Sequence, residues 1–438
     1  MGNYLGSTEQ QQKDMLEKIG LNSMNELYQS IPKEMLVEKL DIPVGKSEFE
    51  VRSIIENMGR KNKVFSKVFR GAGAYNHYIP AVVKQIAAKE EFVTSYTPYQ
   101  PEISQGLLQS IFEYQTMICE ITGMDATNAS VYDGATATAE GINMCLEKKR
   151  LKVLISETTN PMTVQTAITY FSSRDIEFVM IPEKDGLTDL AALKEALDET
   201  TACFIVQQPN YYGGIEAVEE IEGLVHEAKA KFIMSVNPVA STVLKSAGEV
   251  NADIAVGDSQ PFGLPLAFGG PYIGFIATKE KMIRKLPGRI AGETVDEAGD
   301  RAFVLTLQAR EQHIRREKAA SNICSNQALC ALTNAAYMST MGAKGIQEVA
   351  TQCYSKAHYL ADRLSKIAGV QLANNAPFFH EFVTTLPVSE DLVLAKLEEH
   401  DILGGYPTEK GLLWCVTEMN TKEQMDEVAA LVKEVCQS

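Results

Sequence analysis

The stretch from Asp253 to Gly274 combines residue types that could hold a small polar ligand. It reads DIAVGDSQPFGLPLAFGGPYIG, where an apolar run ends in a polar turn and a Gly-Gly-Pro turn leads into a second apolar run. Open α/β sheets bind ligands just beyond the carboxyl ends of their strands, so we expect a cofactor or substrate to lie at this turn. No lysine occurs between Lys245 and Lys279, so the turn offers no amine that could form an imine with a carbonyl compound.

Other catalytic motifs are incomplete or missing from the sequence. Gly71-Ala72-Gly73 matches only the start of a dinucleotide fingerprint, because Asn76 occupies the position of the third glycine. The patterns GxxxxGK[ST], GxSxG and HExxH do not occur. The six histidines show no paired spacing, so we expect no metal site. His77 lies in a loop rich in glycine and aromatic residues, where it could be either a site residue or a structural hydrogen-bonding residue.

The overall composition favours a soluble, cytosolic protein that does not bind nucleic acid. The formal net charge is −16, and such a surface repels phosphate backbones. No stretch approaches the ~18 apolar residues that a membrane helix requires, and the N-terminus has no signal-peptide pattern. The eight cysteines show no CxxC or CxxH spacing, so we expect buried free thiols and no disulfide framework.

The polar turn must be held in place by neighbouring strands. The apolar runs in the middle of the chain predict a β-sheet that would do this. Continuous, β-branched runs separated by helical patterns are typical of a mostly parallel sheet that is covered on both faces. We therefore predict an α/β fold with strands at 151–155, 177–181, 202–206, 231–235, 252–256 and 272–277. Helices are expected at 107–122, 135–149, 190–197 and 217–230.

A length of 438 residues predicts more than one domain, because single cores rarely grow beyond about 300 residues. Residues 1–60 have an acidic helical pattern and are expected to form an N-terminal helical arm. Residues 61–318 form the expected large domain, in which 60–105 has the composition of shaped loops. Residues 319–438 predict a smaller C-terminal α+β domain with strands at 379–384 and 412–416 and a last helix at 421–435.

Several segments together resemble the P-protein of the glycine cleavage system, and specifically the N-terminal-half (alpha) subunit of its two-chain form. They extend over nearly the whole chain: YLGSTEQQQKDMLEKIG, FRGAGAYNHYIPAVV, FVTSYTPYQPEISQG, YDGATATAEG, GDSQPFGLPLAFGGPYIGF and REQHIRREKAASNICSNQAL. Each segment is a weak signal alone, and the combination is specific. The resemblance implies a large domain of the fold-type I pyridoxal-phosphate (PLP) transferase class.

The same resemblance places the family's cofactor residues on this sequence. Aligning Gly269-Gly270-Pro271 with the family's Gly-Gly-Pro turn puts Gln260 in the position of the Schiff-base lysine. Asn237 occupies the position of the aspartate that would pair with the pyridinium nitrogen. The start of the family's phosphate cup corresponds to Gly134, Ala135 and Thr136. Because an amide cannot form an imine, the resemblance implies a degenerate cofactor site.

The resemblance implies that two different chains together form the active enzyme. The PLP-bearing partner, subunit 2 of glycine dehydrogenase (decarboxylating), would hold PLP covalently, and glycine bound there would lose its carboxyl group as CO2. The aminomethyl group would then pass to the lipoyl arm of H-protein. Two unlike pairs of subunits would form a tetramer, and the present chain alone would be inactive.

We expect loops of this chain to complete the partner's pocket, as in fold-type I enzymes whose active sites lie at subunit interfaces. The candidate residues are Tyr75, His77, Tyr78, Thr94, Ser95, Tyr96, Tyr99, Gln100, Glu102 and Ser104. One alternative is a purely structural or regulatory subunit, in which the tyrosines only pack the interface. A second alternative is an independent PLP enzyme that uses Lys245 or Lys279.

Overall fold

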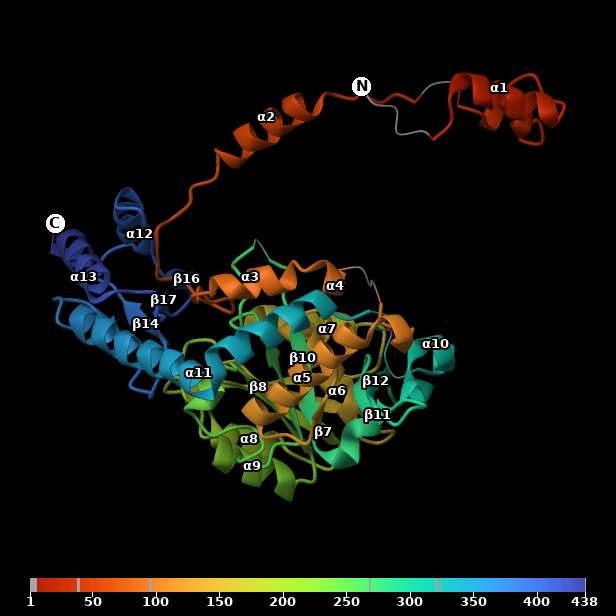
Figure 1. Cartoon of the computed structure of the whole chain (residues 1–438). Helices are drawn as coiled ribbons and strands as arrows, with labels where there is room; N and C mark the ends of the chain where they lie inside the picture. The colour runs from red at the N-terminus through yellow and green to blue at the C-terminus, as the bar shows by residue number, and fades with distance from the viewer. Residues whose placement is uncertain are drawn as a thin grey trace. The chain divides into compact units, whose positions relative to one another are not determined.

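The computed structural model describes residues 6–37, 40–93, 97–267, 269–319, 321, 323 and 325–437 (Figure 1). Its contacts divide the chain into two compact units, Met1–Val64 and Phe65–Ser438. The division into 1–60, 61–318 and 319–438 remains a prediction, because the second unit is not divided further.

The first unit is helical, as the sequence predicts. Its helices are α1 (Glu9–Lys18), η1 (Met24–Tyr28), η2 (Lys33–Met35) and α2 (Glu48–Gly59). Both α-helices begin with a capping box, in which Thr8 pairs with Gln11 and Ser47 pairs with Glu50. These boxes satisfy N–H groups that the first turn of a helix leaves unpaired.

A seven-stranded sheet forms the centre of the second unit, in the order β2-β10-β9-β8-β7-β3-β4. Its strands are β2 (Ala126–Thr127), β3 (Lys152–Ser156), β4 (Glu177–Ile181), β7 (Thr201–Gln208), β8 (Lys231–Val236), β9 (Ile254–Asp258) and β10 (Gly274–Thr278). The pairs β4–β3, β3–β7, β7–β8 and β8–β9 are parallel, and β10 runs antiparallel to both of its neighbours. The predicted α/β fold with a mostly parallel sheet is confirmed.

Helices cover both faces of this sheet. One face packs on α6 (Gly134–Cys145) and α7 (Pro161–Tyr170), with Ile142, Ile155 and Ile205 in the shared core. The other face packs on α5 (Gln105–Thr122), α8 (Leu190–Ala196), α9 (Val218–Glu227) and the first part of α11 (Ala328–Ser365). Burial on both faces explains why the central strands are continuous apolar runs without alternation.

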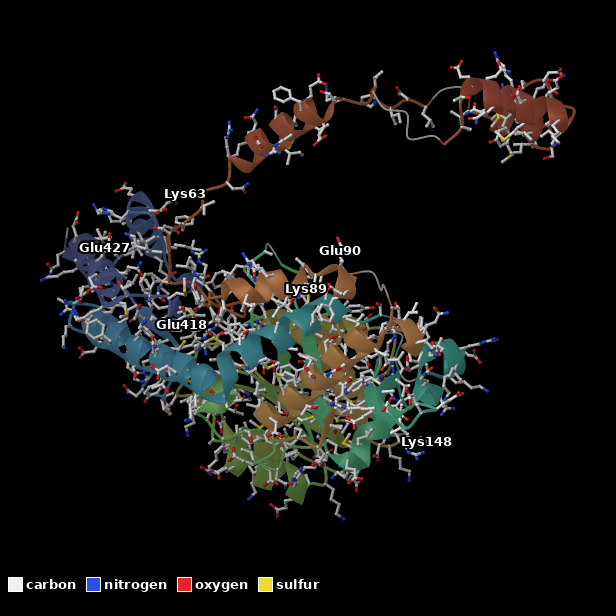
Figure 2. All side chains as sticks on the ribbon, viewed as in Figure 1. Lys63, Lys89, Glu90, Lys148, Glu418 and Glu427 are labelled. Atoms are coloured by element: carbon white, nitrogen blue, oxygen red, sulfur yellow. The ribbon has the colours of Figure 1, made fainter. Side chains whose placement is uncertain are left out.

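The C-terminal part contains a second, antiparallel sheet in the order β13-β14-β17-β16. It comprises β13 (Gln371–Leu372), β14 (Glu381–Thr385), β16 (Tyr406–Thr408) and β17 (Gly411–Cys415), packed on the end of α11, α12 (Glu390–Glu399) and α13 (Lys422–Gln437). Lys67 forms an ion pair with Glu427 at 2.8 Å. Figure 2 labels Glu427, which lies on α13. Gly342 interrupts α11 with a φ of 63°. The helix contributes side chains up to Cys353 to the core of the central sheet, and side chains from Ala357 onward to the core of the C-terminal part.

Some sequence-based predictions were wrong in detail. The segment 60–105 is not only loop, because it contains β1 (Lys67–Val68), α3 (Ala81–Ala87), α4 (Glu90–Val93) and η3 (Pro101–Ile103). These elements are too short to give a clear hydrophobic period. The helix expected at 135–149 ends at Cys145, since the chain turns back through an isolated bridge between Glu147 and Arg150.

The remaining elements of the second unit lie outside the two larger sheets. They are β5 (Glu183–Lys184), β6 (Leu187–Thr188), η4 (Ala240–Thr242), η5 (Glu280–Lys285), β11 (Ala291–Val295), β12 (Arg301–Leu305), η6 (Gln308–Arg310), α10 (Gln312–Arg315), η7 (Arg316–Lys318) and β15 (Ile402–Leu403). Among the described residues, no helix has both the length and the apolar character that crossing a bilayer demands. Seven cysteines are free thiols: five are buried as predicted, Cys119 and Cys436 are half-buried, and Cys324 lies outside the described residues.

Candidate functional site

A pocket of about 200 Å³ lies at the carboxyl ends of β7, β8 and β9 and at the start of α6. This is the edge of a parallel sheet where ligands bind in open α/β folds. The described lining residues are Gly73, Tyr75, Asp133, Gly134, Ala135, Asn160, Met162, Thr163, Gln207, Ser235, Val236, Asn237, Pro238, Gly257, Asp258 and Pro261.

Gln260 lies beside this pocket, two residues after the end of β9. Both polar atoms of its side chain form hydrogen bonds within the chain. Its Oε1 accepts a hydrogen bond from Tyr75 N at 2.9 Å. Its Nε2 donates to Tyr75 O at 2.9 Å and to Leu264 O at 2.7 Å. The side chain is buried, so these bonds satisfy an amide that would otherwise be costly to desolvate. Gln260 therefore ties the 71–78 loop to the sheet and has no nucleophilic atom.

Asn237 follows β8 and faces the same pocket. Its Oδ1 accepts from the backbone N–H groups of Val239 and Ala240, at 2.9 and 3.2 Å. Its Nδ2 is buried without a hydrogen-bond partner among the described residues. A neutral amide held in this way presents no carboxylate that could pair with a protonated pyridine nitrogen.

The start of α6 contains the residues of the predicted phosphate cup, Gly134, Ala135 and Thr136, and carboxyl groups already accept from two of their three N–H groups. Asp133 Oδ1 accepts from Thr136 N at 2.7 Å, as the N-cap of the helix. Asp258 Oδ2 accepts from Gly134 N at 3.1 Å. Burial raises the pKa of Asp258 to about 7. Together with Gln260 and Asn237, this arrangement does not fit PLP in the pocket of this chain.

The loop that Gln260 holds turns Tyr75 toward the C-terminal sheet. The Tyr75 hydroxyl donates to Glu381 Oε2 at 2.8 Å, and Glu381 Oε1 accepts from Ala72 N at 2.7 Å. Burial raises the pKa of Glu381 to about 7. A Cβ at Gly71 would lie 2.3 Å from Glu381 Oε1, so only glycine allows the loop to approach this carboxyl group. Tyr75 is thus a buried contact within this chain.

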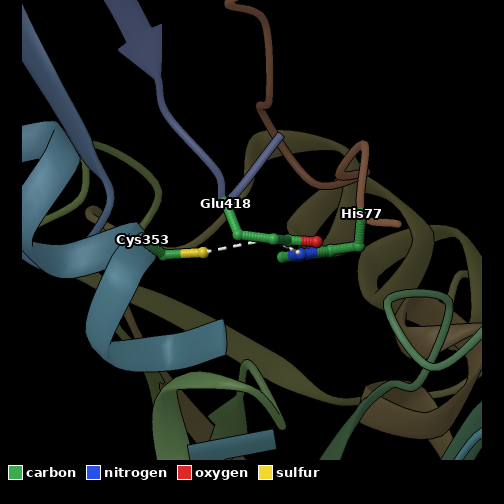
Figure 3. Close-up of side chains that lie close together, drawn as sticks. All are labelled: His77, Cys353 and Glu418. Carbon is green, nitrogen blue, oxygen red and sulfur yellow. Dashed lines mark hydrogen bonds and ion pairs between the residues drawn. The ribbon is translucent and has the colours of Figure 1, made fainter. Parts of the chain in front are cut away.

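His77 belongs to a buried cluster with Cys353 of α11 and Glu418, which follows β17 (Figure 3). His77 Nδ1 lies 2.7 Å from Glu418 Oε2, and Cys353 Sγ donates to the same oxygen at 3.5 Å. Burial alone would raise the pKa of Glu418, but hydrogen bonding and the charge of His77 outweigh burial, so the pKa is lowered. Tyr78 N also donates to Glu418 Oε1, at 2.8 Å.

The His77 cluster is also the group among the described residues that could hold a metal ion. One donor atom from each of the three residues lies within 4.8 Å of the others. The sequence could not have suggested this set, because the residues come from three distant segments and have no metal-binding spacing. As it stands, the cluster is a hydrogen-bonded contact between the 71–78 loop and the C-terminal sheet.

The other candidates lie at or near the surface, except for Ser104. Tyr78 and Tyr99 are 59% and 50% exposed, and Gln100 and Glu102 are exposed. Ser104 is buried at the start of α5. Thr94, Ser95 and Tyr96 lie outside the described residues.

Tyr99 is held by a buried arginine that the sequence analysis missed. Arg289 Nη2 donates to the Tyr99 hydroxyl at 2.7 Å, and the guanidinium carbon lies 5.0 Å from the ring centroid. Tyr99 also lines a cavity of about 390 Å³ together with Glu311, Gln312, His313, Arg316, Glu317 and Ile323. These residues belong to the segment REQHIRREKAASNICSNQAL, so two segments of the resemblance meet here. Distant segments that converge on one cavity cannot be recognised from local spacing.

The chain is similar to known proteins over nearly its full length. The family model described as glycine cleavage system P-protein matches residues 2–432. The probable glycine dehydrogenase (decarboxylating) subunit 1 of Desulfitobacterium hafniense is 47% identical over 444 residues, covering 99% of this chain and 100% of that protein. A crystal structure of glycine decarboxylase (P-protein) of the glycine cleavage system, in inhibitor-bound form, is 40% identical. It covers 99% of this chain and 100% of the other, with a TM-score of 0.93.

A more distant structure shares the fold. It is a C-DES mutant with glycine covalently linked to the PLP cofactor, 15% identical, with a TM-score of 0.62 over 86% of this chain and 98% of the other. The large part of the chain therefore has the fold of the fold-type I PLP enzymes. With a family match over nearly its full length, the chain belongs to the glycine cleavage system P-protein family.

Proposed function

We propose that this chain is the subunit of glycine decarboxylase that does not anchor the cofactor. Together with a PLP-bearing second subunit it decarboxylates glycine, releases CO2 and transfers the aminomethyl group to the lipoyl arm of H-protein. The supporting observation is Gln260, whose amide lies beside the cofactor-type pocket with both polar atoms hydrogen-bonded inside the chain. The bound PLP of the partner supplies the electron sink for decarboxylation.

The nearest lysines along the sequence are poorly placed to replace the missing one. Lys245 is exposed and forms an ion pair with Glu219. Lys279 follows Thr278, which pairs with Ile254 at the start of β9, whereas the pocket lies at the end of β9. Its Nζ donates to Asn251 O at 2.8 Å. These placements argue against an independent PLP enzyme that uses either lysine.

We propose that the surface around Tyr99 completes the partner's active site. The Tyr99 hydroxyl accepts a hydrogen bond from Arg289, so its own proton is left to donate to an oxygen of a bound group. The adjoining cavity is open to such a group, and His313 and Arg316 line it. A surface of this kind would orient a carboxylate and exclude water from it. Tyr78, Gln100 and Glu102 are further exposed candidates for contact with the partner, in a tetramer of two unlike pairs.

The first experiment measures cofactor binding and activity separately. The purified chain is mixed with PLP, alone and with the candidate partner subunit, and near-visible absorbance is recorded before and after borohydride reduction. We expect no reducible imine on this chain alone. The mixture should hold PLP and exchange the glycine carboxyl group with bicarbonate. A reducible imine on the chain alone would refute the proposal.

A variant distinguishes a subunit that completes the pocket from one that only stabilises its partner. Tyr99→Phe removes one hydroxyl and preserves the ring over Arg289. If Tyr99 contacts the reacting group, the exchange rate should fall roughly tenfold or more while the subunits still co-purify. Unchanged exchange in this variant and in Tyr78→Phe would favour the purely structural alternative.

A further inference from the structure

We propose that Asp258 blocks the phosphate cup of this chain's pocket, formed by Gly134, Ala135 and Thr136. The chain would then reject phosphorylated ligands, in addition to lacking a lysine that could bind them. This inference extends the proposed function and relies on it only for equating the pocket with the family's cofactor site. It predicts that restoring the lysine alone would not restore a PLP site.

The start of α6 has the features of a phosphate-binding helix terminus. The helix is 12 residues long and opens with the small residues Gly134 and Ala135 at the carboxyl edge of a parallel sheet. Unpaired N–H groups and the helix dipole make such a terminus attractive for an anion. Asn237 Nδ2, buried and without a partner among the described residues, is a further free donor at the same pocket.

Asp258 already supplies the anion that this terminus favours. Its Oδ2 accepts from Gly134 N at 3.1 Å, and its Oδ1 accepts from Gln260 N at 2.8 Å. One carboxyl group therefore connects the helix start to the residue in the lysine position. Asp133 Oδ1 holds a second N–H of the same turn, that of Thr136.

Gly134 packs tightly against the end of β9, and Asp258 covers its N–H group. A Cβ placed on Gly134 would lie 3.1 Å from both Cβ and N of Asp258, and 3.2 Å from the carbonyl carbon of Gly257. A phosphate that accepted from Gly134 N would have to displace the Asp258 side chain. The exclusion therefore begins with the N–H group of Gly134, which Asp258 already occupies.

Electrostatics adds to the exclusion. Among the described residues that line the pocket there are two carboxylic acids, Asp133 and Asp258, and neither a lysine nor an arginine. A phosphate monoester carries about −1.5 to −2 charges at neutral pH, so it would enter next to like charges without a compensating cation. Burial raises the pKa of Asp258 to about 7, so its carboxyl group gains its charge near neutral pH and repels phosphate more strongly above it.

The test compares PLP with pyridoxal, which lacks the phosphate group and forms an internal hemiacetal, so only the change in their trapping ratio between variants is interpreted. Gln260→Lys supplies an amine, and the full-length variant is incubated with PLP or with pyridoxal. The lysine Nζ attacks the aldehyde carbon, a C=N bond forms and water leaves; borohydride then delivers a hydride and traps the adduct as a secondary amine. Intact mass gives the trapped fraction for each aldehyde.

The reference is the ratio of trapped PLP to trapped pyridoxal in the single variant Gln260→Lys. The double variant Gln260→Lys, Asp258→Ser removes the carboxyl group from the phosphate cup. Its ratio of trapped PLP to trapped pyridoxal should rise by about tenfold or more, the equivalent of one good charge-assisted hydrogen bond. The matched control is Asp189→Ser in the Gln260→Lys background. Asp189 caps α8 with the same kind of carboxylate contact outside the pocket, so its removal should create no preference. Equal ratios with and without Asp258 would overturn the proposal.

A second measurement avoids the lysine substitution, which removes the bonds of Gln260 and could impair folding. Inorganic phosphate should raise the thermal unfolding midpoint of the single variant Asp258→Ser more than that of the wild-type chain. Equal midpoint shifts would contradict the inference. PLP trapping by the wild-type chain would instead refute the proposed function, so the two failures can be told apart.

Discussion

The amide of Gln260 pairs with the backbone of Tyr75 on both sides, accepting from its N–H and donating to its C=O, each at 2.9 Å. The two residues are 185 positions apart in the chain. The side chain of Gln260 therefore fixes the 71–78 loop to the end of the central sheet.

Gln260→Ala should destabilise the second unit. The variant leaves the N–H and C=O groups of Tyr75 without their side-chain partner in a buried site. We expect a loss of roughly 2 to 4 kcal/mol in the free energy of unfolding, measured with urea. Gln109→Ala is the control, because Gln109 is exposed on α5 and bonds only to Glu113 of the same helix. Similar losses in both variants would show that the Gln260–Tyr75 pairing contributes little.

Glu381 should make stability depend on pH between about 4 and 7. Burial raises its pKa from 4.5 to about 7, so the folded chain favours the protonated acid. Its contribution to stability is therefore fully present below about 4.5 and is lost as the pH rises to about 7. Burial raises the pKa of Asp258 to about 7 as well, so that residue acts in the same direction.

Glu381→Gln tests this dependence, because glutamine can bond to both Ala72 N and the Tyr75 hydroxyl but cannot ionise. The wild-type chain should lose stability relative to the variant by the order of 3 kcal/mol between pH 4.5 and 7.5. Urea unfolding at a series of pH values gives this difference. Glu102→Gln, at an exposed position, is the control. Parallel pH profiles for the wild type and Glu381→Gln would contradict the assignment.

The sequence predicts the sheet well because its strands carry their own signal. Buried on both faces, β3, β7 and β9 are continuous apolar runs and need no knowledge of their neighbours. The absence of lysine between 245 and 279 is likewise a property of the sequence alone. Short elements such as α4 could not be predicted, because four residues do not define a helical period.

Much of the candidate site, in contrast, depends on pairs that are distant in sequence. Glu381 and Glu418 contact the 71–78 loop from more than 300 residues away, and nothing near either glutamate marks it as buried. Asp258 lies within the stretch that the sequence singles out, but its role appears only when the start of α6 is placed beside it.

Gly71→Ala should destabilise the chain because the new methyl group has no space. Its Cβ would lie 2.3 Å from Glu381 Oε1 and 2.8 Å from Cys415 Cβ. The loop would have to move away from Glu381, and we expect a loss of about 2 to 3 kcal/mol. Gly223→Ala in α9 is the matched control: no atom lies within 4 Å of the added Cβ, so the helix should gain about 0.5 to 1 kcal/mol. Thermal unfolding should show a lower midpoint for Gly71→Ala and a higher midpoint for Gly223→Ala than for the wild type.

The His77–Glu418 contact can be tested with two substitutions of different polarity. His77→Phe fills a similar space but leaves the Glu418 carboxylate with one fewer hydrogen-bond donor in a largely buried site, so we expect a loss of about 2 kcal/mol or more. His77→Asn offers an amide donor near the Nδ1 position and should lose less. The exposed His400 provides the control, since His400→Phe removes no Glu418 contact. The free energy of unfolding in urea should be highest for the wild type, lower for His77→Asn and lowest for His77→Phe. This order supports a hydrogen-bonded link between the 71–78 loop and the C-terminal sheet. If Phe is tolerated as well as Asn, packing and not the hydrogen bond holds the loop in place.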